Sequence, residues 1–263
     1  MRIYLFANDT KPRAQALGAQ LAKTFPRHGL VASDAASADV ILALGGDGTI
    51  LRAVHEFPSV PVLGLNLGGL GYLSGVAESE FPEALAKLAD GRFAVSERTM
   101  LEIGGLDIRA LNDIVFVREM TGHAAVLDLS VGGTSPTRYL ADGIVIATPT
   151  GSTAYSLSAG GPVLMPDSAS FVVTPMNPHA LGIRPMVVSD SVGMKVTACR
   201  RAASEPELLG VYADGEKVLM LDAGDSATVV KAARGARLVE LEGYDPYEVL
   251  SRKLGWSGTH IRS

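Results

Sequence analysis

The hydrophobic pattern of the first hundred residues alternates between two kinds of segment. Continuous apolar runs are typical of strands buried on both faces of a parallel sheet, whereas apolar side chains repeated about every 3.6 positions indicate amphipathic helices. The expected strands span residues 2–7, 40–44 and 60–65, and the expected helices span residues 12–25, 50–57 and 81–88. This alternation predicts an α/β unit with a mostly parallel sheet.

The pattern changes at about residue 93. Short runs rich in β-branched residues follow one another with turn signals between them, which predicts a β-rich second domain. These runs lie at residues 100–103, 108–117, 124–131, 144–148, 171–174, 194–198, 208–212, 217–221, 227–230 and 237–241. A final apolar stripe, formed by Val249, Leu250 and Leu254, predicts a helix that packs back on another element.

We therefore expect two domains in the chain. Residues 1–98 are expected to form the α/β N-terminal domain, and residues 99–245 the β-rich C-terminal domain. The last helix, within about residues 246–263, is expected to pack back on the α/β domain.

The composition excludes several classes of protein. Of the 263 residues, 47% are apolar and 19% are charged, which argues against intrinsic disorder. The net charge of −5 argues against a general nucleic-acid-binding protein, because such proteins carry an excess of positive charge. The single cysteine, Cys199, excludes an internal disulfide and a cysteine-based zinc site, and it fits a cytoplasmic location. Long uncharged stretches at residues 57–77 and 143–166 are interrupted by Gly, Pro, Ser and Thr, so we expect no membrane helix and no membrane partner.

Glycines cluster at the end of one predicted strand. The run Gly45-Gly46-Asp47-Gly48-Thr49 follows the apolar residues 40–44 and precedes a helical pattern. Backbone N–H groups at a helix start attract phosphate oxygens, and glycine permits close approach because it has no Cβ. The run therefore predicts a phosphate-binding loop, although the Gly-Lys dipeptide of P-loop enzymes occurs nowhere in the chain.

Asp47 needs an explanation in such a loop, because its carboxylate would repel phosphates. Two chemical roles would explain it: it accepts a proton from an attacking hydroxyl, or it helps to hold a magnesium ion. The alternative is structural, since aspartate is among the best residues for capping a following helix. The doubled glycine after an apolar strand favours the functional interpretation.

A second unusual segment spans residues 142–162. A predicted strand ends there in a turn rich in hydroxyls and glycine, and a helix start follows. Neutral hydrogen-bond donors of this kind suit a ribose or an adenine. Capping by Ser152 or Thr153 would explain one hydroxyl only. The residues that carry the hydroxyls are Thr148, Thr150, Ser152, Thr153, Tyr155, Ser156 and Ser158.

These segments, in this order and spacing, resemble the bacterial NAD kinase family over nearly the whole chain. The run Thr-Pro-Thr-Gly-Ser-Thr-Ala-Tyr is far more specific than Gly-Gly-Asp-Gly, which diacylglycerol-kinase-like and phosphofructokinase enzymes also carry. The motifs that carry the resemblance are Gly-Gly-Asp-Gly-Thr at 45–49, Asn-Leu-Gly-Gly-Leu-Gly-Tyr-Leu at 66–73, Leu-Asn-Asp at 111–113, the segment 142–162, Pro-His at 178–179 and Arg-Pro at 184–185.

The resemblance implies ATP-dependent phosphorylation of the adenosine ribose 2′-hydroxyl of NAD, which gives NADP. It implies that Asp47 is the catalytic proton acceptor, that the β-rich domain binds NAD, and that the active site lies between the domains. Asp113 stands where family members usually have glutamate, so its shorter side chain loses a direct contact or reaches the ligand through water. The expected binding residues are Gly45, Gly46, Gly48, Arg52, Asn112, Asp113, His123, Asp142, Thr153, Ala154, Tyr155, Ser156, Leu157, Ser158, Asn177 and Glu216.

The resemblance also implies ATP as phosphoryl donor and Mg²⁺ bound through nucleotide phosphates, and we predict no residue directly as a metal ligand. It implies a homo-oligomer, either a dimer or a tetramer. Two other functions stay open: a lipid or sugar kinase that shares the glycine loop, and a non-catalytic NAD(P)-sensing module.

The dipeptide Asp214-Gly215, which precedes Glu216 and lies between two strand-like runs, predicts a hairpin turn.

Overall fold

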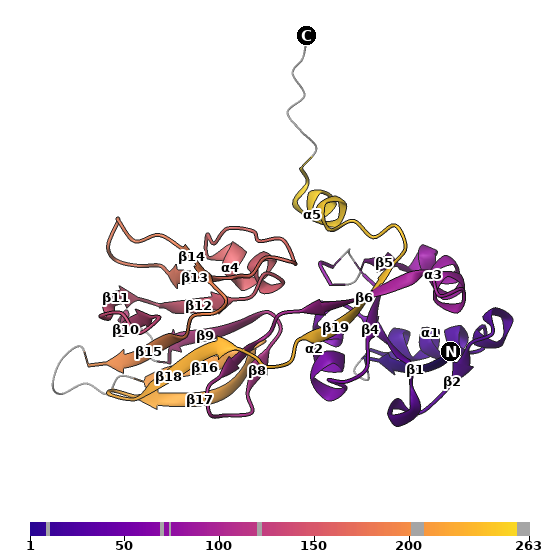
Figure 1. The fold of residues 1–263 in the computed structure, drawn as a ribbon, viewed down its shortest axis with the longest axis horizontal. Helices are drawn as coiled ribbons and strands as arrows, with labels where there is room; N and C mark the ends of the chain where they lie inside the picture. The colour runs from indigo at the N-terminus through magenta and orange to yellow at the C-terminus, as the bar shows by residue number, and fades with distance from the viewer. Residues whose placement is uncertain (9–10, 69–70, 74, 120–122, 201–207, 257–263) are drawn as a thin grey trace, which may run out of the picture. The chain divides into compact units, whose positions relative to one another are not determined.

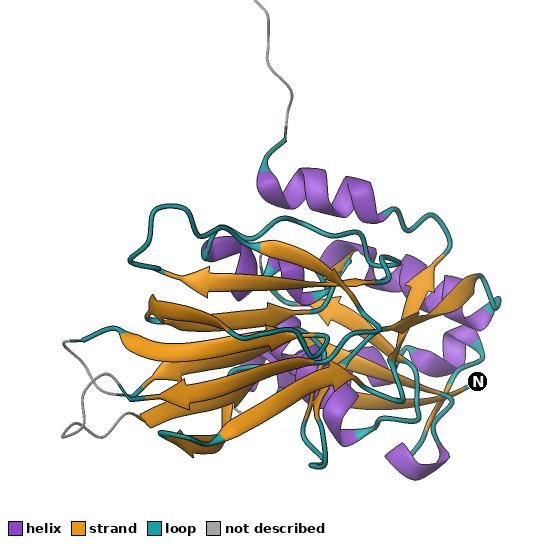
Figure 2. Ribbon diagram, turned by 60° about the vertical axis from the view of Figure 1, so that its left-hand side comes forward, coloured by secondary structure: helices purple, strands orange, loops and turns teal. Residues whose placement is uncertain are grey.

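The computed structural model describes residues 1–8, 11–68, 71–73, 75–119, 123–200 and 208–256. The chain folds as two compact units: unit 1 comprises Met1–Glu97 and Ala236–Ser263, and unit 2 comprises Arg98–Gly235. Figure 2 shows most of the helices in unit 1 and mainly strands in unit 2. Gly69, Leu70 and Ser74, and the end of the expected C-terminal helix at 257–263, lie outside the described residues.

Unit 1 is built on a mostly parallel sheet with the strand order β2-β1-β3-β4-β19-β6, in which β5 also pairs with β4 (Figure 1). Its central strand β3 is buried over its whole length, as the continuous apolar run predicts. The strands are β1 (Arg2–Ala7), β2 (Val31–Ala32), β3 (Val40–Gly45), β4 (Val62–Asn66), β5 (Val76–Ala77), β6 (Phe93–Arg98) and β19 (Ala236–Leu241).

Amphipathic helices supply the rest of the core of unit 1. Phe25, Leu85 and Leu88 pack in one buried cluster with Leu42 and Leu63 of the sheet. The α-helices are α1 (Pro12–Ala22), α2 (Asp47–Glu56), α3 (Phe81–Ala89) and α5 (Pro246–Leu254), and the 3₁₀ turns are η1 (Phe25–His28), η2 (Ala35–Ser37) and η3 (Glu78–Glu80).

Unit 2 contains two antiparallel sheets, ordered β11-β10-β15-β18-β7-β8 and β14-β13-β12-β9-β16-β17. Phe116 and Ile144 of the second sheet pack in one buried cluster with Leu127 and Val196 of the first. The strands are β7 (Leu101–Ile103), β8 (Arg109–Ala110), β9 (Asp113–Arg118), β10 (Ala125–Val131), β11 (Thr137–Ala141), β12 (Gly143–Ala147), β13 (Ser170–Met176), β14 (Met186–Ser189), β15 (Met194–Cys199), β16 (Leu208–Ala213), β17 (Glu216–Asp222) and β18 (Ser226–Lys231), with η4 (Gly151–Thr153) and α4 (Tyr155–Ser158) between β12 and β13.

The expected fold class, an α/β part followed by a β-rich part, is confirmed. Several details differ from the pattern. The apolar run expected at 108–117 is divided into β8 and β9, and β2, β5, β6, β11 and β14 were not expected. The run at 237–241 was grouped with the β-rich residues, but Leu238 of β19 pairs in parallel with Val62 of β4. The local sequence pattern of a strand does not identify a parallel partner that lies so far away in the chain.

The junction between β3 and α2 depends on a glycine. A methyl group at Gly45 would lie 2.8 Å from Thr49 Cβ, an atom that side-chain rotation cannot move away. A methyl group at Gly46 would have no neighbour within 4 Å, and the backbone there, with φ −104 and ψ −172, is open to any residue.

We therefore predict that Gly45→Ala lowers the free energy of unfolding by about 1–3 kcal/mol, because the added carbon overpacks the first turn of α2. The matched control Gly46→Ala is expected to change it by less than about 0.5 kcal/mol. Urea denaturation of both variants checks this. Equal losses in the two variants would contradict the steric explanation.

Candidate functional site

Asp47 is the first residue of α2 and follows the carboxyl end of β3, a central strand of the parallel sheet. Ligands of open α/β sheets bind at this edge. The cap position of α2 is occupied by Gly46, which has no capping side chain. The Asp47 carboxylate instead accepts hydrogen bonds from a different segment: Oδ2 from Tyr72 N–H at 2.9 Å, and Oδ1 from Leu73 N–H at 3.3 Å. The carboxylate of this half-buried acid therefore binds the segment after β4.

The glycines beside Asp47 divide into two kinds. Gly45 is required by its contact with Thr49. A side chain at Gly46 or Gly48 would meet no atom within 4 Å, and neither residue has a positive φ. Neither packing nor conformation within the described part of the chain explains glycine at 46 and 48. A ligand that approaches the main chain closely would explain both.

The segment after β4 is bound to the end of β3. Leu67 N–H donates to Gly45 O at 3.2 Å, and the buried Asn66 Oδ1 accepts from Gly68 N–H at 2.9 Å. This is the segment that continues to Tyr72 and Leu73. The second motif of the resemblance therefore supplies the donors that hold Asp47, a role that the sequence did not reveal.

Arg52 lies on the exposed side of α2, one to two turns after Asp47. Its guanidinium carbon is 5.5 Å from the centroid of the Phe6 ring, in a cation–π contact. Phe6 itself packs edge-to-face on Phe57, with ring centroids 5.6 Å apart. Arg52 is therefore held at the carboxyl end of β1, beside the same edge of the sheet.

In unit 2, a single carboxylate organises the turn that carries Asn112 and Asp113. Asp214 Oδ1 accepts from Asn112 N–H at 2.7 Å and from Asp113 N–H at 3.2 Å, while Oδ2 accepts from Leu111 N–H at 2.8 Å. Asp214 and Gly215 have φ of 48 and 87 in the β16–β17 hairpin, which confirms the expected turn. Asp214 was not among the expected site residues, and its Asp-Gly dipeptide was the available signal.

Asp113 is buried, with only 5% of its surface exposed. Burial, and to a smaller extent the negative charge of Asp214, raises the pKa of its carboxyl from 3.8 to about 7. The side chain is therefore partly protonated near neutral pH. A protonated carboxyl can donate a hydrogen bond, which the ionised form cannot.

The turn after β12 uses several of its hydroxyls internally. Thr148 donates to Leu111 O at 2.5 Å, Ser152 donates to Pro149 O at 2.6 Å, and Ser156 shares a 2.8 Å hydrogen bond with Thr174. These side chains are fully buried. The hydroxyls of Thr148, Ser152 and Ser156 therefore stabilise the turn itself.

The remaining residues of this run are more accessible. Thr153 is half-buried and donates to Thr150 O at 3.0 Å. Tyr155 and Ser158 are exposed, whereas Ala154 and Leu157 are half-buried. The Tyr155 side chain presents an aromatic ring, and Ser158 presents a hydroxyl, on the short helix α4.

Gly151 joins this run to Asn112. A methyl group at Gly151 would overlap the Asn112 backbone, and Thr148 N–H donates to Asn112 O at 2.9 Å. Ala147 pairs with Asp113 across β12 and β9, and Glu216 begins β17 beside the hairpin turn. The structure therefore gathers Asn112, Asp113, Glu216 and the run 153–158 at one end of the second sheet.

Asp142 belongs to a different group, at the other end of β12. Its Oδ1 pairs with Arg118 Nε at 2.8 Å, and its Oδ2 accepts from Asn177 Nδ2 at 2.9 Å. Arg118 also donates to the backbone oxygen of His123 at 3.3 Å. Six residue steps along β12 separate Asp142 from Thr148, or about 20 Å in an extended strand. Arg118 contacts two expected residues, Asp142 and His123, but was not itself expected, and its sequence context gave no signal.

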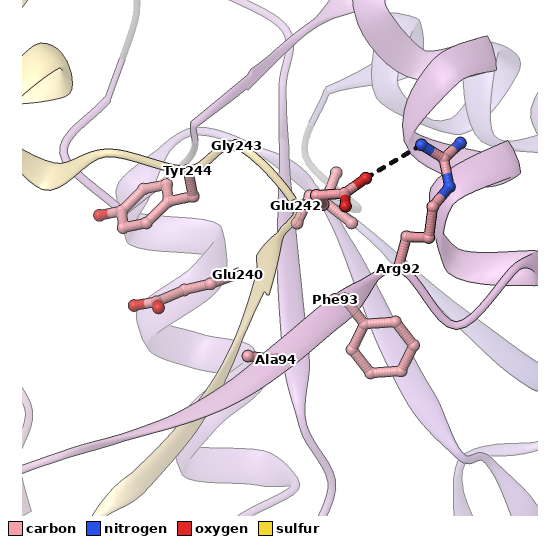
Figure 3. A pocket seen from close by; sticks show the side chains of 8 residues that line it. Arg92, Phe93, Ala94, Glu240, Glu242, Gly243 and Tyr244 are labelled. Carbon is pink, nitrogen blue, oxygen red and sulfur yellow. Dashed lines mark hydrogen bonds and ion pairs between the residues drawn. The ribbon is translucent and has the colours of Figure 1, made fainter.

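One pocket lies away from the expected site residues. Its volume is about 350 Å³, and it is lined by Arg92, Phe93, Ala94 and residues 240–244, none of which is an expected site residue (Figure 3).

Within the described residues, no group of three or more His, Cys, Asp or Glu side chains could hold a metal ion. Mg²⁺ commonly binds one or two carboxylates together with substrate phosphates, so the half-buried Asp47 fits a metal that arrives with a nucleotide. None of the helices described here is long and apolar enough to cross a membrane.

Two family profiles match the chain. The profile described as the ATP-NAD kinase N-terminal domain matches residues 4–93, and that described as the ATP-NAD kinase C-terminal domain matches residues 111–241. The NAD kinase of Symbiobacterium thermophilum is 43% identical over 230 residues, which cover 84% of this chain and 79% of that protein. The NAD kinase of Pseudomonas fluorescens is 36% identical over 251 residues, with coverages of 90% and 83%.

Solved structures give the same result. Yeast NADH kinase complexed with NADH has a TM-score of 0.88 at 25% identity, and the match covers 100% of this chain and 90% of that one. An NAD kinase from Archaeoglobus fulgidus in complex with ATP has a TM-score of 0.81 at 26% identity, with coverages of 98% and 100%. Profiles, relatives and structures agree over most of the chain, and the chain therefore belongs to the NAD kinase family.

Proposed function

We propose that this chain transfers the γ-phosphoryl group of ATP to the 2′-hydroxyl of the adenosine ribose of NAD, giving NADP, with Asp47 as the proton acceptor. The observation that carries the proposal is the environment of Asp47. Its carboxylate lies at the carboxyl end of β3, is held by two backbone N–H groups, and is flanked by Gly46 and Gly48. Those two glycines leave space for a ligand to approach the main chain.

The chemistry of phosphoryl transfer depends mainly on positioning and on charge neutralisation. In the proposed step, the 2′-oxygen attacks the γ-phosphorus, Asp47 takes the hydroxyl proton, and ADP leaves. The backbone at residues 45–49 binds phosphate oxygens. Mg²⁺, when bound through the phosphates, supplies neutralisation of their charge.

Residues of unit 2 are proposed to bind the nucleotides. The exposed ring of Tyr155 can stack on an adenine, and the exposed Ser158 hydroxyl can bond to a ribose. Asn112 and Asp113 are proposed to contact the same nucleotide. Ser156 is proposed to act through its backbone, since its hydroxyl bonds to Thr174. Four further residues are proposed to contact the bound nucleotides: Asp142, Asn177, His123 and Glu216.

We also propose that the protein forms a homo-oligomer and is located in the cytoplasm. The strands β11 and β14 lie at the edges of their sheets, and edge strands can pair with another chain. Leu181 is 93% exposed in the loop that precedes β14. The free thiol of Cys199 fits a reducing compartment.

We predict that Asp47→Asn lowers kcat by about 10²–10⁴-fold while the Kd for NAD stays within a few-fold, because general-base assistance is lost but the binding surface remains. NADP formation with ATP and Mg²⁺ measures kcat, and calorimetry measures Kd. Asp90→Asn, at an exposed acid in the same unit, is the control. Near-normal turnover of the Asp47 variant would remove Asp47 from the chemistry. Tight NAD binding by the wild type without NADP formation would overturn the proposed activity.

The second prediction concerns Asp113 and pH. Because its pKa is about 7 in the folded chain against 3.8 ordinarily, the native state binds the proton more tightly than the unfolded state does. Its contribution to stability is therefore fully present below about pH 4 and is lost as pH rises through 7. The free energy of unfolding of the wild type, relative to Asp113→Asn, is expected to fall between pH 5 and pH 8 by about 2–3 kcal/mol, since about two pH units of that window lie below the folded pKa. Urea denaturation across this range measures it, and a difference that does not vary with pH would contradict the burial argument.

The oligomer is tested by mass. Light scattering after size exclusion is expected to give a multiple of the 27.4 kDa chain mass, because the exposed edges favour self-association. A mass of 27.4 kDa at micromolar concentration would contradict this part of the proposal.

A further inference from the structure

The chain after β19 returns over the segment that holds Asp47. Tyr244 N–H donates to Leu241 O at 2.9 Å in a tight turn, in which Gly243 has a φ of 88. Figure 3 shows Tyr244 just beyond this turn. Asp245 then caps α5 by accepting Tyr247 N–H at 2.8 Å. The turn and the cap fix where α5 begins.

Two side chains of this C-terminal segment contact the residues around Tyr72. Lys253 Nζ, in the last turn of α5, is 5.3 Å from the centroid of the Tyr72 ring, which is the range of a cation–π interaction. The Tyr244 ring lies against Gly75, where an added methyl group would be 3.6 Å from it. The segment that carries Tyr72 is therefore contacted at two positions.

Tyr72 connects these contacts to the acid. Its own N–H donates to Asp47 Oδ2 at 2.9 Å, so a displacement of Tyr72 displaces a donor that orients the carboxylate. Partial burial, and then the negative charge of Asp47, raises the pKa of the Tyr72 phenol. The Tyr72 side chain therefore interacts electrostatically both with the Asp47 carboxylate and with the Lys253 ammonium group.

We propose that Lys253 is a positioning residue for the phosphoryl transfer: its ammonium group holds the Tyr72 ring, and Tyr72 N–H thereby holds Asp47 in the orientation that receives the proton. The inference rests on the proposed function of Asp47 and adds a residue that touches no reacting atom. Rates of reaction depend steeply on such orientation.

The last turn of α5 offers a matched control for this role. Arg252 and Lys253 both lie in that turn, where a cation interacts favourably with the helix dipole. Arg252 forms an ion pair with Glu248 on the same helix, at 2.7 Å. Removing the charge at 252 therefore reproduces the effect on the helix without removing the contact with Tyr72.

The experiment compares Lys253→Met, Lys253→Arg and Arg252→Met in the full chain. Lys253→Met is expected to lower kcat about two- to fivefold, the equivalent of about 0.5–1 kcal/mol for an exposed cation–π contact, with the KM for NAD unchanged. Lys253→Arg is expected to restore the wild-type kcat because guanidinium also binds an aromatic face. Arg252→Met is expected to leave kcat unchanged. Equal kcat values for the two methionine variants, or no recovery with arginine, would overturn the inference.

A second comparison separates this inference from the proposed function. In an Asp47→Asn background, Lys253→Met is expected to change kcat by a factor near one, because the group that it positions is already lost. The same two- to fivefold loss in both backgrounds would contradict the inference alone. Near-normal turnover of Asp47→Asn by itself would contradict the proposed function. Unchanged thermal unfolding of the Lys253 variants shows that a lower kcat does not reflect a loss of folded protein.

Discussion

The orientation of the proposed proton acceptor depends on two hydrogen bonds, from Tyr72 N–H and Leu73 N–H to the Asp47 carboxylate. A carboxylate at the start of a helix ordinarily bonds to the N–H groups of that helix. Here the neighbouring segment supplies the donors, so the orientation of the acid is coupled to the residues after β4. Gly45 allows the tight junction of β3 and α2 that brings Asp47 to this place.

Unit 2 uses the same kind of interaction for a different purpose. Asp214, in a hairpin turn, binds the N–H groups of residues 111–113, and its charge contributes to the raised pKa of the buried Asp113. In both units, therefore, a carboxylate accepts hydrogen bonds from the backbone of a segment distant in the sequence. Because the partner segments are far apart in the sequence, each carboxylate stabilises a contact that helix or strand formation alone would not produce.

Much of the fold follows from local patterns, whereas the site follows only in part. The continuous apolar run at 40–44 predicted β3, and the Asp-Gly dipeptide predicted the hairpin at 214–215. The partner of β19 could not be predicted, because parallel pairing joins distant residues. The motifs predicted site roles for Asp47 and for the 153–158 run. They did not reveal that Ser156 is buried against Thr174 or that Arg118 binds Asp142, since these contacts depend on side-chain packing.

The most direct test of the central claim is a crystal structure of the protein with NAD bound. The account predicts an oxygen of Asp47 within hydrogen-bond reach of the ribose 2′-oxygen, about 2.6–3.2 Å, while Tyr72 N–H still donates to the carboxylate. A dinucleotide bound with its 2′-oxygen remote from Asp47, and with the carboxylate bonded only to residues 72 and 73, would contradict the claim.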